Sequence, residues 1–481
     1  MKQFFLPVIA TFMVGVVACK NDSNSVPEPG PVSADTLRGA ITSDRTLEAG
    51  KKYWIDGAVF VKNNATLTIK EGVILKAIKK GKTAATADIS SFLIITRGAK
   101  INAVGTKDKP IVFTSAEPKG SRAHGDWGGV MLLGKTKVNS VYDGKPGRQM
   151  EGFPTTQGQA YGDDIVGGGD LADDNSGILK YVRIEFAGVP LSDTKNSELN
   201  SLTLIGVGKS TTIEYVQSSF GGDDAFEWFG GNVNARYLVA YRCLDDDFDT
   251  DNGYSGNVQF GLSIKDKDIS DWALPGESNG FESDNDAEGS AKEPFTAATF
   301  SNITFIGPWA FNGGANIDAT KGAAFRWGAY LRRNTRLGIF NTVFAGFPTG
   351  INIKDQATGN AANTNALEIK NSFVGVTPKQ KIEQTGITGV DIKAWFMTPA
   401  FGNDTSINNV DDFKFAKMTG DLKDADARPV AGSPLIGKAS FTSSNRIKDA
   451  YFKVVDYVGA FKVGDDWTQG WTNFDPNNAD Y

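Results

Sequence analysis

The sequence has little histidine and cysteine, and each shortage excludes a class of function. A single histidine, His124, cannot build a zinc site or a Ser-His-Asp relay by itself. Two cysteines, Cys19 and Cys243, are too few and too differently placed for a disulfide framework. Basic charge is not in excess either: the formal net charge is −6, so we expect no nucleic-acid partner.

Sustained helical periodicity is also missing, whereas glycine is abundant. The chain has 55 glycines, 11% aromatic residues and only 6 methionines, which favours a turn-rich β protein. Short apolar segments are separated by Gly, Asn and Asp turns. Several of these segments resemble one another, namely residues 179–188, 213–222, 235–246, 300–307, 337–346 and 367–376.

The spacing of these segments indicates a solenoid. The second and third start 22 residues apart, about one turn of a coil of three strands. Other spacings are longer, and we expect polar insertions at about 138–176, 266–298 and 378–430. We predict one all-β domain over 37–481, a parallel β-helix with long loop insertions and a C-terminal capping segment. A β-propeller is the alternative, but its blades need a more regular repeat of about 40–50 residues.

The one long apolar run lies at the N-terminus, where Lys2 precedes "FFLPVIATFMVGVVA" and Cys19 follows it. This resembles a bacterial lipobox, which implies a signal peptide over 1–18 and a lipid on Cys19. An ordinary signal peptide is the alternative. Residues 19–36 are polar and rich in Pro and Ser, so we expect a flexible tether. "CKNDS" is similar to the surface-export signals of Bacteroidota lipoproteins, although Asn21 stands where an acid is usual. The resemblance implies an outer-membrane protein that faces the cell surface.

Both ends of the body carry a second resemblance. "AVFVKNNATLTIKEGVILKA", "SFLIITRGAKINAVGTKDKPIVFTS" and "GDWGGVMLLG" are similar to the opening coils of bacterial right-handed β-helix proteins. "PVAGSPLIGKASF" and "VVDYVGAFKVGDDWTQGWTNFDP" resemble the closing segments of the same lipoproteins. The resemblance implies a right-handed β-helix of the pectate-lyase-like superfold, and it implies no particular activity.

Acidic residues gather in three clusters at coil-like separations. "RCLDDDFDTDNG" places Asp245, Asp247, Asp249 and Asp251 at alternate positions, which would share one face of an extended strand. "GGDDAFEW" lies 22 residues upstream, and "FESDND" lies downstream. Carboxylate oxygens from adjacent turns suit Ca²⁺, whereas a solvated, empty edge is the alternative. The predicted Ca²⁺ ligands are Asp223, Asp224, Asp245, Asp247, Asp249, Asp251, Glu282 and Asp284.

Aromatic residues beside arginine give candidate ligand contacts, because glycan binding uses planar stacking surfaces and bidentate donors. The candidates are Trp228, Arg242, Arg326 and Trp327. The alternative is that the tryptophan lies inside and the arginines pair with acidic loops. We expect a Ca²⁺-stabilised, non-catalytic protein that binds polysaccharide or another surface glycan.

Three other functions stay open. A Ca²⁺-dependent pectate-type lyase would need a base, for which Arg242, Lys265 and Arg326 are possible, and a glycoside hydrolase would need paired acids such as Asp224 and Asp247. An accessory lipoprotein would dock on an outer-membrane transporter.

Overall fold

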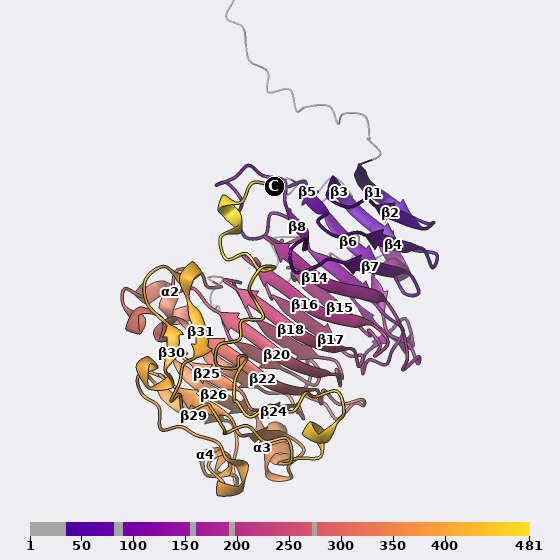
Figure 1. Ribbon diagram of the computed structural model, residues 1–481. Helices are drawn as coiled ribbons and strands as arrows, with labels where there is room; N and C mark the ends of the chain where they lie inside the picture. Colours follow the sequence, from indigo (N-terminus) through magenta and orange to yellow (C-terminus); the bar gives the residue numbers. More distant parts are fainter. Residues whose placement is uncertain (1–34, 81–89, 154–159, 192–197, 272–276) are drawn as a thin grey trace, which may run out of the picture. The chain divides into compact units, whose positions relative to one another are not determined.

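Parallel strand pairing organises this protein. In the computed structural model, which describes residues 35–80, 90–153, 160–191, 198–271 and 277–481, 25 strands join into one continuous parallel sheet. The sheet winds into a right-handed β-helix within the unit Thr36–Tyr481 (Figure 1). No described helix has the length and apolar character that a membrane crossing requires. The expected β-helix is confirmed, and the signal peptide, Cys19 and nearly all of the tether lie outside the described residues.

Each coil contributes strands to three faces. The first face contains β2 (Arg45–Leu47), β4 (Thr66–Ile69), β7 (Lys100–Val104), β24 (Gly338–Phe340) and β27 (Glu368–Lys370). The second contains β5 (Ile74–Ala77), β8 (Ile111–Ser115), β25 (Val343–Ala345) and β28 (Phe373–Gly375). Five longer strands turn the corner between these two faces: β14 (Gly177–Glu185), β16 (Thr212–Ser219), β18 (Asn234–Tyr241), β20 (Asn257–Ile264) and β22 (Thr299–Ile306).

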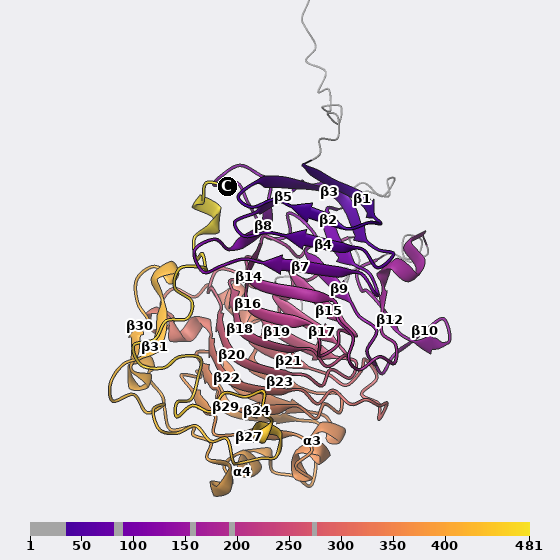
Figure 2. The same cartoon turned by 45° about the vertical axis from the view of Figure 1, so that its right-hand side comes forward.

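The third face carries the candidate site, and Figure 2 shows its middle strands stacked one above another. It contains β6 (Phe92–Ile95), β9 (Val130–Leu133), β15 (Leu202–Ile205), β17 (Phe226–Phe229), β19 (Phe248–Asp251), β21 (Phe281–Ser283), β23 (Trp327–Leu331), β26 (Thr349–Lys354) and β29 (Gln380–Thr385). The first coil begins with β1 (Thr36–Ile41). Strand β3 (Lys52–Val61) pairs with β1 from the following coil, and it pairs in turn with β5 and β6.

The repeated sequence segments occupy equivalent positions in successive coils. All six lie on the first and second faces, and Ile213 pairs with Ala235 in the register that the 22-residue spacing predicts. The expected insertions are only partly loops. Residues 266–298 contain β21 and residues 378–430 contain β29, both of which are strands of the third face. Their short, polar sequences hid these strands.

Inward side chains from the three faces form a continuous apolar core. Strand alternation places Phe226 and Trp228 inside, and Phe226 stacks on Phe248 of the next coil with ring centroids 5.5 Å apart. Phe281 continues the stack at 6.4 Å. Such ladders of like side chains bury apolar area between coils, which is the main stabilising contribution in a solenoid.

A second aromatic ladder lies outside the corner between the first two faces. Tyr181, Tyr215 and Tyr237 all have left-handed backbone conformations, with φ of 53°, 56° and 60°, which turn β14, β16 and β18 through the corner. Their rings stack at 4.4 and 4.3 Å. The backbone strain at these non-glycine residues is offset by the stacking of the rings that the conformation aligns.

The remaining elements lie outside the coils. Short hairpin strands are β10 (Val141–Tyr142), β11 (Lys145–Pro146), β12 (Arg148–Gln149), β13 (Val166–Gly167), β30 (Phe415–Lys417) and β31 (Asp426–Pro429). The described α-helices are α2 (Ala319–Ala324), α3 (Gln356–Asn363) and α4 (Ile392–Phe396). The strand pair β12–β13 belongs to the first insertion and lies beside the third face, where Arg148 covers the ring of Phe229 at 4.8 Å.

Residues 436–481, here called the C-terminal strap, run back along the flank of the coils (Figure 1). Ser440 contacts Asn341, Asn473 contacts Gln217, and Asn477 contacts Arg122. At Asn341, Gln217 and Gln259 the side-chain amide both donates to and accepts from the strap backbone. The strap therefore does not cover one end of the helix as a cap would. Its apolar side chains pack instead on the tyrosine ladder outside the coils. The ring centroid of Trp471 lies 6.0 Å from that of Tyr181 and 5.9 Å from that of Tyr215.

Candidate functional site

The outer surface of the third face brings together carboxylates from consecutive coils. On β17 the buried neighbours Phe226 and Trp228 turn Glu227 outward. Parallel register then places Glu227 beside Asp249, and Asp249 beside Glu282. Outward-facing residues that pair in register on successive coils form a column. In the next such column, Phe229 pairs with Asp251. Acids that are far apart in sequence thus become neighbours because the coil length repeats.

The turn before the third face contains a ladder of side-chain hydrogen bonds, and two of its members are acids. The backbone N–H of Asp224 donates to Asn200 at 3.2 Å, and the N–H of Asp246 donates to Asp224 at 2.8 Å. The ladder continues from Asn279 N–H to Asp246 at 2.8 Å and from Trp327 N–H to Asn279 at 3.1 Å. Asparagine supplies the same acceptor at both ends, so the negative charge at Asp224 and Asp246 exceeds what the ladder needs.

Two sets of three carboxylates approach metal-ligand geometry. They are Asp223, Asp224 and Asp245, and Asp224, Glu227 and Asp249, and within each set one oxygen per residue lies within 4.8 Å of the others. Asp224 belongs to both sets. One buried carboxylate oxygen on Asp245 and one on Asp249 have no hydrogen-bond partner. Carboxylate oxygens are donors that Ca²⁺ prefers, and water or backbone carbonyls would have to supply the rest of its about six to eight oxygen ligands.

We call Asp223, Asp224, Glu227, Asp245, Asp249 and Asp251 the acidic row. Within the described residues, none of the six forms an ion pair with lysine or arginine. Burial, reinforced by neighbouring carboxylates, raises the pKa of the first five well above the ordinary range. Burial and the nearby Asp284 raise the pKa of Asp251 to about 7. Among the described residues, the row is therefore a cluster of carboxyl groups without an ion-pair partner on lysine or arginine.

Comparison with known proteins agrees with this architecture. A family model described as "Pectate-lyase like beta helix domain" matches residues 39–472, which is most of the chain. The chain belongs to this pectate-lyase-like β-helix family. Neither a curated protein nor a solved structure matches the chain.

Two predicted site residues lie in the core of this pectate-lyase-like helix and not on its surface. Asp247 is fully buried because β19 begins only at Phe248; it accepts from Ser263 and pairs with Lys265 Nζ at 3.3 Å. The expectation that Asp245, Asp247, Asp249 and Asp251 share one extended face is therefore wrong for Asp247. Trp228 is also fully buried and stacks on Tyr254 at 5.4 Å, so it cannot contact a glycan.

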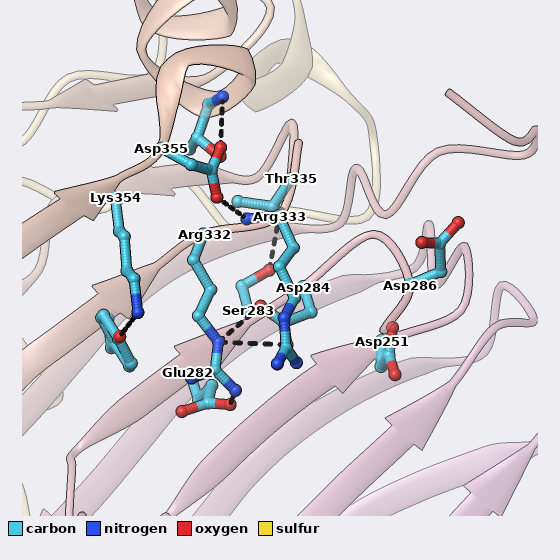
Figure 3. A network of polar contacts seen from close by, with 12 residues as sticks. Asp251, Glu282, Ser283, Asp284, Asp286, Arg332, Arg333, Thr335, Lys354 and Asp355 are labelled. Carbon is cyan, nitrogen blue, oxygen red and sulfur yellow. Dashed lines mark hydrogen bonds and ion pairs between the residues drawn. The ribbon is translucent and has the colours of Figure 1, made fainter. Parts of the chain in front are cut away.

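Glu282 and Asp284 are engaged by arginine. Arg332 Nε lies 2.9 Å from Asp284 Oδ1, and its Nη2 binds Glu282 (Figure 3). Arg333 Nη1 lies 2.6 Å from Asp284 Oδ2. Neither acid belongs to a three-carboxylate set among the described residues. Both predicted Ca²⁺ ligands are thus engaged in an ion-pair network with Arg332 and Arg333.

An aromatic pair lies next to these acids in the same outward column. Tyr330 pairs in register with Glu282, and its ring stacks on Trp327 with centroids 3.9 Å apart. Trp327 is half-buried, and its Nε1–H donates to Glu383 at 2.7 Å. Arg326 directly precedes Trp327, and its buried Nε has no partner in the described part of the chain. The structure thus places Trp327 and Arg326 near the acidic row.

Arg242 lies apart from this group. It forms an ion pair with Asp266, and its guanidinium covers the ring of Phe220 at 4.7 Å. Sequence reasoning missed the acceptor Asn200, whereas the pairing of Arg332 with Glu282 and Asp284 agrees with the alternative that the arginines pair with acidic segments. The register that sets Tyr330 opposite Glu282 is visible only once β21 is recognised as a strand.

Proposed function

We propose that this protein is a non-catalytic glycan-binding β-helix that uses Ca²⁺ on its third face. The observation that carries the proposal is the acidic row, whose carboxylates share close positions without a cationic side chain. Two unit charges about 5 Å apart repel by about 3 kcal/mol at an effective dielectric of about 20. The row therefore takes up either protons or a cation, and at neutral pH in a medium containing Ca²⁺ the cation satisfies its oxygens best.

The glycan part of the proposal rests on the aromatic pair that lies beside the acidic row. Trp327 is half-buried and stacks on the buried ring of Tyr330, and Glu383 and Lys354 border this pair with polar groups. Sugar rings stack on such surfaces, while carboxylates and ammonium groups bind hydroxyls. A glycan that crosses from Trp327 toward Asp249 would contact both the exposed part of the indole ring and the bound cation. Its own carboxylates, if it carries any, would complete the cation's ligands.

Binding without catalysis is favoured by the state of two of the three candidate bases, Lys265 and Arg242. Lys265 is fully buried, and its ammonium is held by Asp247 and by the carbonyl oxygen of Cys243 at 3.2 Å. Arg242 is held by Asp266. A Ca²⁺-dependent lyase needs a base that reaches the sugar, and these two groups have other partners.

The cellular part of the proposal comes from the N-terminal sequence. The lipobox-like segment before Cys19 supports a lipid anchor in the outer membrane, and the polar tether that follows supports display at the cell surface. Metabolic labelling with a palmitate analogue tests the anchor. Label in the wild type and none in Cys19→Ala is expected, and equal label in both would contradict it.

Thermal melting of the lipid-free mature chain tests the cation. We expect a higher Tm with millimolar Ca²⁺ than in excess EDTA, because a ligand at about 100 times its Kd stabilises the folded state by about 2.7 kcal/mol. Asp249→Asn should remove most of this shift. The control Asp163→Asn changes an exposed acid outside the row and should keep it. An unchanged Tm in the wild type would refute the cation.

The glycan test uses the same protein loaded with Ca²⁺. Calorimetric titration with polygalacturonate should give binding that EDTA removes and Trp327→Ala weakens. Ultraviolet absorbance of the same mixture should stay constant over hours. A rise in absorbance from unsaturated product would replace the binder with a lyase.

A further inference from the structure

The counter-ion of the third face changes from one coil to the next. On β17 and β19 the acidic row has no cationic partner among the described side chains, whereas on β21 the chain provides one. Glu282 follows Asp249 in register, and Asp284 follows the paired residue Ser283. The same outward columns thus carry acids on three coils, but only the third is neutralised internally.

Arg332 supplies this internal charge from the following coil. It comes directly after β23, and its guanidinium lies 2.9 Å from Asp284 Oδ1 and 3.9 Å from Glu277 while it also binds Glu282. Its side chain is only 15% exposed. The ring of Tyr330 lies 4.7 Å from the guanidinium carbon. Three carboxylates therefore surround one fixed positive group, as Figure 3 shows for Glu282 and Asp284.

We propose that Arg332 takes the place of a further divalent cation and so ends the cation-binding part of the third face at β19. This inference rests on the proposed function, because it concerns how far the cation-binding surface extends. A guanidinium donates from fixed directions and does not exchange with solvent ions, whereas Ca²⁺ accepts additional oxygen ligands. One residue thereby sets both the number of bound cations and the point where a glycan meets a guanidinium and aromatic surface.

Replacement of Arg332 by methionine should let the carboxylates of β21 bind a cation, as we propose for those of β17 and β19. Methionine keeps an unbranched apolar stem that packs on Tyr330, but it leaves Glu282 unpaired and Asp284 with Arg333 alone. Glu282 and Asp284 then lose most of their neutralising positive charge, and Asp251 on the neighbouring strand has no ion-pair partner among the described residues. We expect R332M to bind one more Ca²⁺ per chain than the wild type.

The matched control is Lys354→Met. Lys354 lies on the next coil of the same face, donates to the hydroxyl of Tyr330 at 2.8 Å, and has no carboxylate partner among the described residues. Its removal takes away one positive charge from the same surface without freeing an acid. We expect K354M to bind as many Ca²⁺ ions as the wild type.

The experiment is equilibrium dialysis of the folded mature chain against Ca²⁺, followed by metal analysis of wild type, R332M and K354M. One additional ion in R332M alone supports the inference. Equal numbers in R332M and a Ca²⁺-binding wild type would overturn it, as would an additional ion in K354M. No bound Ca²⁺ in the wild type would overturn the proposed function, and a single ion in R332M against that background would leave the role of Arg332 standing.

A second variant keeps the inference testable if R332M does not fold. Glu282→Gln keeps the size and one acceptor of the side chain that Arg332 binds. Because Glu282 serves Arg332 and not a cation, E282Q should bind the wild-type number of Ca²⁺ ions, whereas Asp249→Asn should bind fewer. A loss of Ca²⁺ in E282Q comparable to that in D249N would refute the role assigned to Arg332.

Discussion

At the scale of single residues, Asp224 has two roles, one as a hydrogen-bond acceptor in the turn ladder and one as a carboxylate of the acidic row. One of its oxygens accepts the N–H of Asp246, and Asn200 accepts the N–H of Asp224 in the same way in the preceding coil. Asparagine at 224 therefore preserves the ladder and removes only the charge. Alanine removes both.

We expect Asp224→Asn to melt at or above the wild-type Tm in EDTA, because it relieves repulsion from Asp223 and Asp246. In Ca²⁺ it should melt below the wild type, because it weakens both carboxylate sets. Asp224→Ala should lose about 1–3 kcal/mol in both conditions, since the N–H of Asp246 is left without its acceptor. Thermal melts of the two variants with and without Ca²⁺ check this. A lower Tm for D224N than for D224A in EDTA would contradict it.

The acidic row also predicts a pH dependence. A carboxyl whose pKa is higher in the folded than in the unfolded chain keeps its proton longer when folded, so stability falls as pH rises through that interval. For Asp251 the interval runs from the ordinary value of about 3.9 to about 7. Without divalent cations we expect the Tm to fall between pH 5 and pH 8. Ca²⁺ should raise the Tm more at pH 8 than at pH 5, where protons compete for the same oxygens. Equal Ca²⁺ shifts at both pH values would argue against binding at the row.

A buried ion pair behind the row gives a third residue-scale prediction. Lys265 and Asp247 are both fully buried and pair at 3.3 Å. Lys265→Met leaves the carboxylate of Asp247 without its cation, which should cost about 3–5 kcal/mol in the free energy of unfolding. The double variant with Asp247→Leu should recover part of this loss, because it removes the orphaned charge. Denaturant unfolding of the three proteins measures the difference, and a double variant no more stable than the single one would contradict the argument.

At the scale of elements, the sequence identifies two faces of the helix and hides the third. Strands such as β16 and β18 show repeated apolar patterns that predict their pairing 22 residues apart. Strand β21 has only three residues within an acidic segment, so its alternation is too short to recognise. The acidic clusters were therefore predicted as neighbours from spacing alone. The inward turn of Asp247 could not be predicted, because it depends on where β19 begins.

The start of β14 gives a sharp test of this packing. Gly177 has φ of 113°, and a Cβ there would overlap the carbonyl oxygen of Ile101 on β7. Gly177→Ala should destabilise the protein by about 3–5 kcal/mol through overlap and strain. Gly144 also has positive φ, but open space surrounds its Cβ direction, so Gly144→Ala should cost only about 1 kcal/mol. Chemical denaturation compares the free energies of unfolding of the two variants. Equal losses of stability would show that the positive φ, and not the overlap with Ile101, causes the destabilisation of Gly177→Ala.

At the scale of the whole chain, the C-terminal strap ties early coils to late ones. Trp471 is fully buried between the strap and the tyrosine ladder. Trp471→Ala should lower the free energy of unfolding by about 3–5 kcal/mol and make residues 436–481 sensitive to protease before the coils are cut. Trp54→Ala, at a side chain 37% exposed on β3, is the control and should change neither property much. Uniform cleavage throughout the chain in W471A would contradict a separately released strap.

The strap also changes how such a molecule comes apart. A stack of coils that contact only their neighbours can fray from either end, one repeat at a time. Because amide clamps at Gln217, Gln259 and Asn341 attach one continuous segment to coils far apart in the stack, loss of an end coil also disturbs contacts near the other end. The strap follows the coils in the chain, so a ribosome delivers it after them. Cooperative unfolding is therefore expected only after the strap has been synthesised. Before that point the coils of the nascent chain can open one at a time, and they unfold together only once the strap contacts have formed.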